Sequence, residues 1–117
     1  MIENFTKRAY LTLFNLLNLR FNNTCDKELR RLLGDMCPYT FKDSNSADPA
    51  TYEDFLDCLN DCYSETKKMD ITTTFKASIK FLEVYRDEFG FAIQKVIDDI
   101  SLKEYETIFA ETNKREF

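Results

Sequence analysis

Apolar residues recur along most of this chain at intervals of three or four positions, which is the spacing of one face of an α-helix. Residues 2–21 show the pattern most densely, because additional apolar side chains widen the stripe into a broad arc. The members of this arc are Ile2, Phe5, Ala9, Leu11, Leu13, Phe14, Leu16, Leu17, Leu19 and Phe21. A helix with so wide an apolar arc is expected at the centre of its domain, or it keeps one side for a partner.

Residues that favour helix ends divide the chain further. Thr24 is predicted to cap a second helix that stops before Pro38. The apolar face of this helix consists of Leu29, Leu32, Leu33 and Met36. Asp70 or one of the threonines after it begins another helix, for which Gly90 is the expected stop.

The C-terminal part of the chain continues the helical pattern. Residues 91–100 form either a separate helix or a continuation past a kink at Gly90, and Ser101 with Glu104 makes a capping box for a final helix. No alternation typical of strands extends far enough to predict a sheet. The chain is therefore predicted to be all-α, a compact bundle of five or six helices in a single domain over residues 1–117.

The segment 48–65 is predicted to be a helix with three kinds of surface. Asp48 suits the N-cap, and Pro49 suits the first helical position. The predicted core face holds Tyr52, Phe55, Leu56, Leu59 and Tyr63. The opposite face holds Glu53, Asp54, Asp57 and Asp61, and the boundary holds Cys58 and Cys62.

Acidic residues are concentrated in this part of the chain. The 117 residues carry a formal net charge of −5, and residues 43–65 hold seven carboxylates without a single Lys or Arg. A negative charge disfavours nucleic acid as a partner, because phosphate binding needs a basic surface. Carboxylates three or four positions apart repel one another when no cation lies between them. This repulsion favours a face that binds a basic protein, and a merely solvated helix surface is the simpler alternative.

The residue types present argue against catalysis and metal binding. The chain has no histidine, the commonest general base and neutral metal ligand. Its four cysteines, Cys25, Cys37, Cys58 and Cys62, lack the closely paired spacing of zinc sites. We therefore predict no metal, no cofactor and no enzymatic activity, and expect four reduced thiols at the edges of the core.

The apolar segment 9–19 bears on the compartment. It is too short to span a bilayer, and it lacks the small-residue cleavage pattern of a signal peptide. We expect a cytoplasmic protein without membrane association, in a compartment that keeps thiols reduced.

The segment YEDFLDCLNDCYSE, residues 52–65, is an acidic helix that carries tyrosines. Together with the small size, the negative charge and the lack of histidine, it resembles small acidic helical immunity proteins of bacteria, of the colicin and contact-dependent growth inhibition types. The resemblance implies a cytoplasmic antidote that binds one cognate toxin domain, often a nuclease, and blocks its active site or a nearby exosite. Nuclease domains hold phosphates and tend to be basic, which suits an acidic face.

This interpretation assigns partner-binding roles to particular residues. They are Glu53, Asp54, Asp57 and Asp61, with Asp43, Asp48 and Glu65 in support and Tyr39 as an aromatic anchor. Tyr52 and Tyr63 are further aromatic candidates, for which core packing is the alternative. An antidote of this kind is expected to be a monomer or weak dimer that forms a salt-sensitive complex. The alternative function is a helical adaptor or small regulatory subunit that binds through the apolar excess of residues 9–21.

Overall fold

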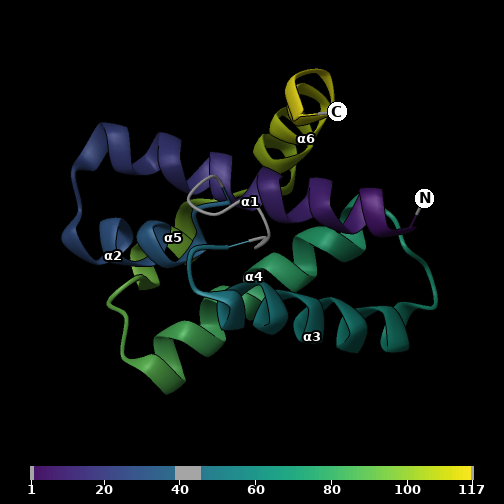
Figure 1. Cartoon of the computed structure of the whole chain (residues 1–117), viewed down its shortest axis with the longest axis horizontal. Coiled ribbons are helices and arrows are strands. Elements are labelled where there is room, and N and C mark those ends of the chain that lie inside the picture. The colour runs from purple at the N-terminus through teal and green to yellow at the C-terminus, as the bar shows by residue number, and fades with distance from the viewer. Residues whose placement is uncertain (1, 39–45, 117) are drawn as a thin grey trace.

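Six helices make up the regular structure of the computed structural model, which describes residues 2–38 and 46–116, with side chains for 5–38 and 46–112 (Figure 1). They are α1 (Ile2–Thr24), α2 (Lys27–Met36), α3 (Pro49–Thr66), α4 (Ile71–Phe89), α5 (Gln94–Asp99) and α6 (Leu102–Glu116). No strand occurs within the described ranges, and the Cα radius of gyration is 13.1 Å, as expected for one compact body of this length. The prediction of an all-α bundle of five or six helices is confirmed.

Polar and glycine caps fix three of the helix boundaries where the sequence predicts them. The Asp48 carboxylate accepts a hydrogen bond from the Ala50 N–H at 3.0 Å, and the Asp70 carboxylate accepts one from the Thr73 N–H at 2.8 Å. Gly90 ends α4 with a φ of 72°, a left-handed conformation that costs glycine little. After this turn, α5 is a separate short helix, which decides between the two alternatives for residues 91–100.

The predicted start of the second helix is wrong by two residues. Thr24 is the last residue of α1, and its hydroxyl donates to the Arg20 carbonyl at 2.9 Å. The chain reverses at Cys25, which has a φ of 54°, and Asp26 then caps α2 by accepting from the N–H groups of Glu28 and Leu29. Asp26 takes this role because the helix of α1 continues through Thr24.

The core surrounds α1 and α4. α1 packs against α2, α3, α4 and α6, while α3 and α4 form a long antiparallel pair (Figure 1). The buried apolar side chains of α1 are Ala9, Tyr10, Leu11, Leu13, Phe14, Leu16 and Leu17. The wide apolar arc of residues 9–21 is therefore used mainly by the core, and Leu19 stands apart with an exposed fraction of 50%.

Hydroxyl groups line the place where α1, α4 and α6 meet. The buried Tyr105 hydroxyl of α6 donates to the Ala9 carbonyl at 3.3 Å and lies 3.1 Å from the Thr74 hydroxyl. Burial raises the pKa of Tyr105 to about 12, so the phenol stays protonated and available as a donor. These contacts let three helices cross closely without leaving the hydroxyl groups unsatisfied.

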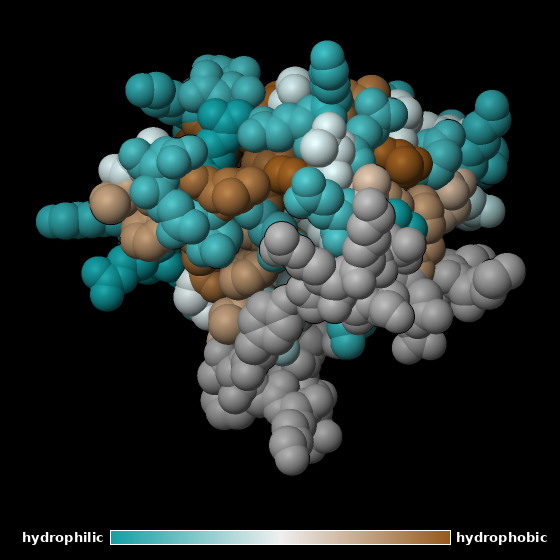
Figure 2. All heavy atoms as spheres, turned by 90° about the horizontal axis from the view of Figure 1, so that it is seen from above, coloured by the Kyte–Doolittle hydropathy of each residue, from teal (hydrophilic) through white to brown (hydrophobic). Residues whose placement is uncertain are grey.

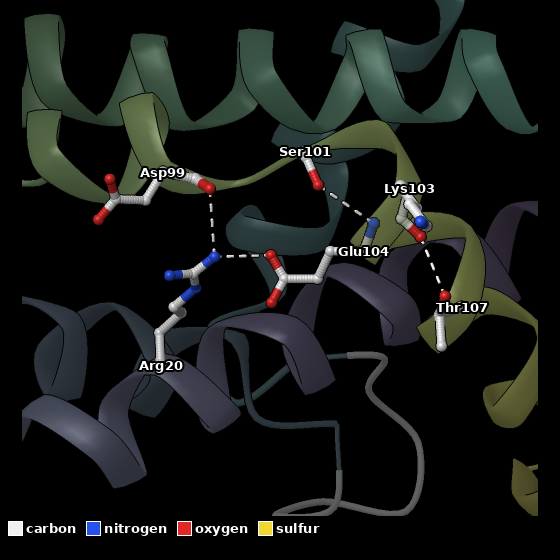
Figure 3. A network of polar contacts seen from close by, with 6 residues as sticks. All are labelled: Arg20, Asp99, Ser101, Lys103, Glu104 and Thr107. Carbon is white, nitrogen blue, oxygen red and sulfur yellow. Dashed lines mark hydrogen bonds and ion pairs between the residues drawn. The ribbon is translucent and has the colours of Figure 1, made fainter.

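Two arginines of α1 fasten α6 in place. Arg20 forms an ion pair with Glu104 at 2.6 Å and donates to the Asp99 carbonyl, beside the capping contact between Ser101 and Glu104 (Figure 3). Arg8 stacks on the Phe109 ring at 3.9 Å and donates to the Phe109 carbonyl.

On the upper side of the molecule, hydrophobic atoms appear as patches separated by hydrophilic side chains (Figure 2).

Candidate functional site

The acidic segment forms α3, which lies against α4. Its core face holds Phe55 and Leu59 as predicted, together with Thr51, Cys58 and Cys62. Tyr63 was assigned to the core face and is instead 45% exposed, and Leu56 is only partly buried. The helix is thus rotated relative to the prediction, because the small Thr51, Cys58 and Cys62 side chains allow close packing against α4.

The two α3 cysteines are buried and belong to the hydrophobic core. Burial raises the pKa of the Cys58 thiol to about 11 and also raises that of Cys62. The nearby carboxylates Asp54 and Asp61 contribute less to the pKa of Cys58 than burial does. All four cysteines are free thiols, with Cys25 exposed and Cys37 partly buried. The buried, protonated thiols of Cys58 and Cys62 are poor nucleophiles and metal ligands.

The carboxylates of α3 form a surface that we call the acidic ridge, defined as Asp48, Glu53, Asp54, Asp57, Asp61 and Glu65. All of them are solvent-exposed except Asp54, which is partly buried. Asp54 accepts a hydrogen bond from the Tyr85 hydroxyl at 2.7 Å, and burial raises the pKa of Tyr85 so that it remains a donor. The structure therefore brings six of the seven acidic site candidates onto one helix and its cap.

One lysine of α4 partly offsets this charge. Lys80 forms an ion pair with Asp61 at 3.1 Å, and both side chains are largely exposed, at 40% and 63%. An ion pair so open to solvent is weak and exchanges readily with other partners. Within the described part of the chain, no ion pair is formed by the other members of the acidic ridge.

The remaining site candidates have different outcomes. Asp43 and Tyr39 lie outside the described residues. Tyr52 is partly buried and packs edge-on against the Tyr10 ring at 4.9 Å, which is the core role given as its alternative. Tyr63 is the one α3 tyrosine whose ring is largely open to solvent.

A pocket of about 310 Å³ adjoins the N-terminal end of the ridge, between α2, α3 and the C-terminal end of α4. Its lining includes Arg31, Asp35, Asp48, Asp54, Tyr85 and Phe89. Asp35 and Phe89 were not among the predicted site residues, because Asp35 lies in a basic segment and Phe89 continues the apolar stripe of α4. The only available signal was the position of Phe89 directly before Gly90, where a helix leaves the core.

Neither a metal centre nor a membrane span is found in the described residues. No three Asp, Glu or Cys side chains there come close enough together to hold a metal ion. None of the described helices is long and apolar enough to cross a bilayer. Comparison with protein families, with curated proteins and with solved structures finds no match for this chain.

Proposed function

We propose that the protein is an immunity protein, an antidote that binds and neutralises a cognate basic toxin domain, of the nuclease class, through the acidic ridge. The observation that carries this proposal is the outward projection of Glu53, Asp57 and Asp61 along one side of α3. Their mutual repulsion destabilises the free protein slightly, and a basic partner relieves it. The negative electrostatic field of these carboxylates also accelerates encounter with a basic partner.

The placement of apolar residues supports this choice over the adaptor alternative. Residues 9–17 of α1 supply the core, so the apolar excess that an adaptor would use is mostly buried. What stays open is Leu19, next to Ile108 in a shallow groove between α1 and α6. A single exposed leucine is ordinary for a soluble surface and gives an adaptor little area to bind.

The proposal is tested with the toxin domain itself. The candidate is the C-terminal domain encoded by the reading frame upstream of this gene, produced in a bacterial host with and without the protein. Growth and nucleic-acid integrity are expected to be restored only when both are present. The purified pair is expected to form a one-to-one complex whose affinity falls as salt rises. A toxic domain that is neither bound nor inhibited contradicts the proposal.

Charge reversal then locates the contact. The triple variant Glu53→Lys, Asp57→Lys, Asp61→Lys is expected to fold and to lose binding, because all three side chains point into solvent. Asp54 is left intact, since its bond to Tyr85 gives it a structural role. The matched control Glu83→Lys, Glu106→Lys, Glu111→Lys changes the net charge equally at other exposed positions and is expected to bind far better. Equal losses in both triple variants contradict a ridge-specific contact.

A further inference from the structure

The pocket between α2, α3 and α4 combines an aromatic wall with an acidic lining. Phe89 is 53% exposed at this site, and its ring continues a series of contacts through Tyr85 to Phe81, at 4.8 and 4.5 Å between ring centroids. An exposed aromatic ring beside a cavity offers a flat apolar face on which a ligand group can stack. Asp35, Asp48 and Asp54 supply the negative charge around the rings.

Arg31 already lines the pocket, but its single positive charge does not balance the three carboxylates. Arg31 pairs with Glu28 at 3.2 Å and stacks on the Phe91 ring at 4.3 Å. No described Lys or Arg forms an ion pair with the three pocket carboxylates. Burial, and then the charge of Asp48, raise the pKa of Asp35, and the opposing charge of Arg31 offsets this rise only in part.

We propose that this pocket receives an arginine side chain of a basic protein partner, with the guanidinium among Asp35, Asp48 and Asp54 and against the Phe89 ring. The inference rests on the proposed function in taking the partner to be a basic protein. It adds a recognition centre at one end of the acidic ridge, where the ridge alone offers only diffuse attraction.

Arginine fits the pocket better than lysine or a metal ion does. A planar guanidinium donates to two carboxylates at once and stacks on an aromatic face, which a lysine ammonium cannot do equally well. The protein itself twice places a guanidinium on a phenylalanine ring, Arg31 on Phe91 and Arg8 on Phe109. The pocket carboxylates do not come together closely enough to hold a metal ion, whereas a guanidinium bridges wider gaps.

The acceptors are held in place before any partner arrives. The Tyr85 hydroxyl orients Asp54, and the start of α3 orients Asp48 through its capping bond to Ala50. The Asp48 N–H also donates to the Asp35 carbonyl at 3.1 Å, which ties the end of α2 to the start of α3. Fixed acceptors reduce the entropy lost on binding.

The first test uses N-acetyl-arginine methylamide as the probe, titrated into the ¹⁵N-labelled full chain. Saturable shift changes are expected around Asp35, Asp54 and Phe89, with a Kd in roughly the millimolar range for so small a ligand. The neutral citrulline analogue is expected to cause none. Shift changes that are spread evenly along the ridge, or that are equal for citrulline, overturn the inference.

Matched substitutions sharpen this test. Phe89→Ala and Asp54→Asn are each expected to weaken the probe by about fivefold or more, since each removes a cation–π or charged contact. Asparagine keeps an oxygen that can accept from Tyr85, so the fold is preserved. Tyr63→Ala, which also removes an exposed aromatic ring, and Asp57→Asn lie on exposed parts of α3 outside the pocket, and they are expected to leave affinity within about twofold. Equal effects of pocket and control variants overturn the inference.

The toxin domain separates this inference from the proposed function. The double variant Asp35→Asn, Phe89→Ala is expected to weaken that complex at least about tenfold, as hot-spot residues do. If it binds normally while the ridge triple variant does not, the pocket inference is overturned and the proposed function stands. If the wild-type protein binds no toxin domain, the proposed function fails, and the arginine titration still decides whether the pocket recognises a guanidinium.

Discussion

The two long helices α1 and α3 both lie against α4, and they use their charges in opposite ways. The arginines of α1 turn toward the bundle, where Arg8 and Arg20 bind carbonyls, a ring and a carboxylate of the α5–α6 segment. The carboxylates of α3 other than Asp54 are exposed, and among the residues that the structure describes Asp61 alone of them forms an ion pair. The arginines of α1 stabilise the fold, whereas most carboxylates of α3 remain exposed to solvent and open to contact with a partner. A count of charged residues cannot separate these roles, because they depend on the neighbouring helices.

The largest expected effect tests the two faces of α3 itself. Phe55 is fully buried between the Tyr10 and Phe81 rings, so Phe55→Ala is expected to lower the free energy of unfolding by about 3–5 kcal/mol. Urea denaturation measures the change. Glu53→Ala, two positions away on the exposed face, is the control and is expected to have no marked effect. Similar losses in both variants would contradict the assigned rotation of α3.

A smaller effect is expected at the arginine contacts of α1. Arg20→Ala removes the ion pair with Glu104 and the hydrogen bond to the Asp99 carbonyl, which together are worth about 1 kcal/mol at this partly exposed position. Lys80→Ala removes the ion pair of the acidic ridge and is expected to leave the urea midpoint unchanged. A greater loss for Lys80→Ala would show that ridge charge stabilises the fold.

The smallest effects concern pH, and they have opposite signs at two aspartates. The capping bond from Thr73 lowers the pKa of Asp70, so its stabilisation is present above the ordinary pKa and is lost as the pH falls through the lower folded value. Burial raises the pKa of Asp35, so its ionisation opposes folding above the raised pKa and stops doing so below the ordinary value of 3.8.

Two substitutions read out these signs. Asp70→Ala is expected to destabilise the protein at pH 7, and Asp35→Asn is expected to be neutral or stabilising there. The difference for Asp35→Asn is expected to shrink near pH 3, because that pH lies below the ordinary pKa of 3.8. The difference for Asp70→Ala is expected to shrink only as the pH falls through the lowered pKa of Asp70. Urea denaturation at the two pH values measures them. If Asp35→Asn is destabilising at pH 7 and not at pH 3, the uncompensated charge assigned to the pocket is contradicted.

Much of the fold could be predicted because its signals are local. Asp48, Asp70 and Gly90 mark helix ends through their own backbone and cap chemistry, and the apolar arc of residues 2–21 marks the central helix. The rotation of α3 could not be predicted, since hydrophobicity ranks Tyr63 above Thr51. Close packing prefers the smaller side chain, and the tyrosine hydroxyl tolerates solvent.

The candidate site was predicted in part for the same reason. Acidic residues on one helix, such as Glu53 and Asp57, share a face by periodicity alone. The pocket joins Asp35 of α2 to Phe89 of α4, and 54 positions along the chain separate them. Such a juxtaposition depends on how α2 packs against the α3–α4 pair, which no local sequence pattern specifies.

The buried thiols of α3 report how often the α3–α4 hairpin opens. Cys58 and Cys62 are closed off from solvent, and their high pKa leaves almost no thiolate at pH 7, so an alkylating reagent must wait until α3 lifts from α4. The exposed Cys25 has no such delay. The delay between alkylation of Cys25 and alkylation of Cys58 and Cys62 therefore measures how slowly the α3–α4 hairpin separates. A partner bound across that hairpin would lengthen this delay.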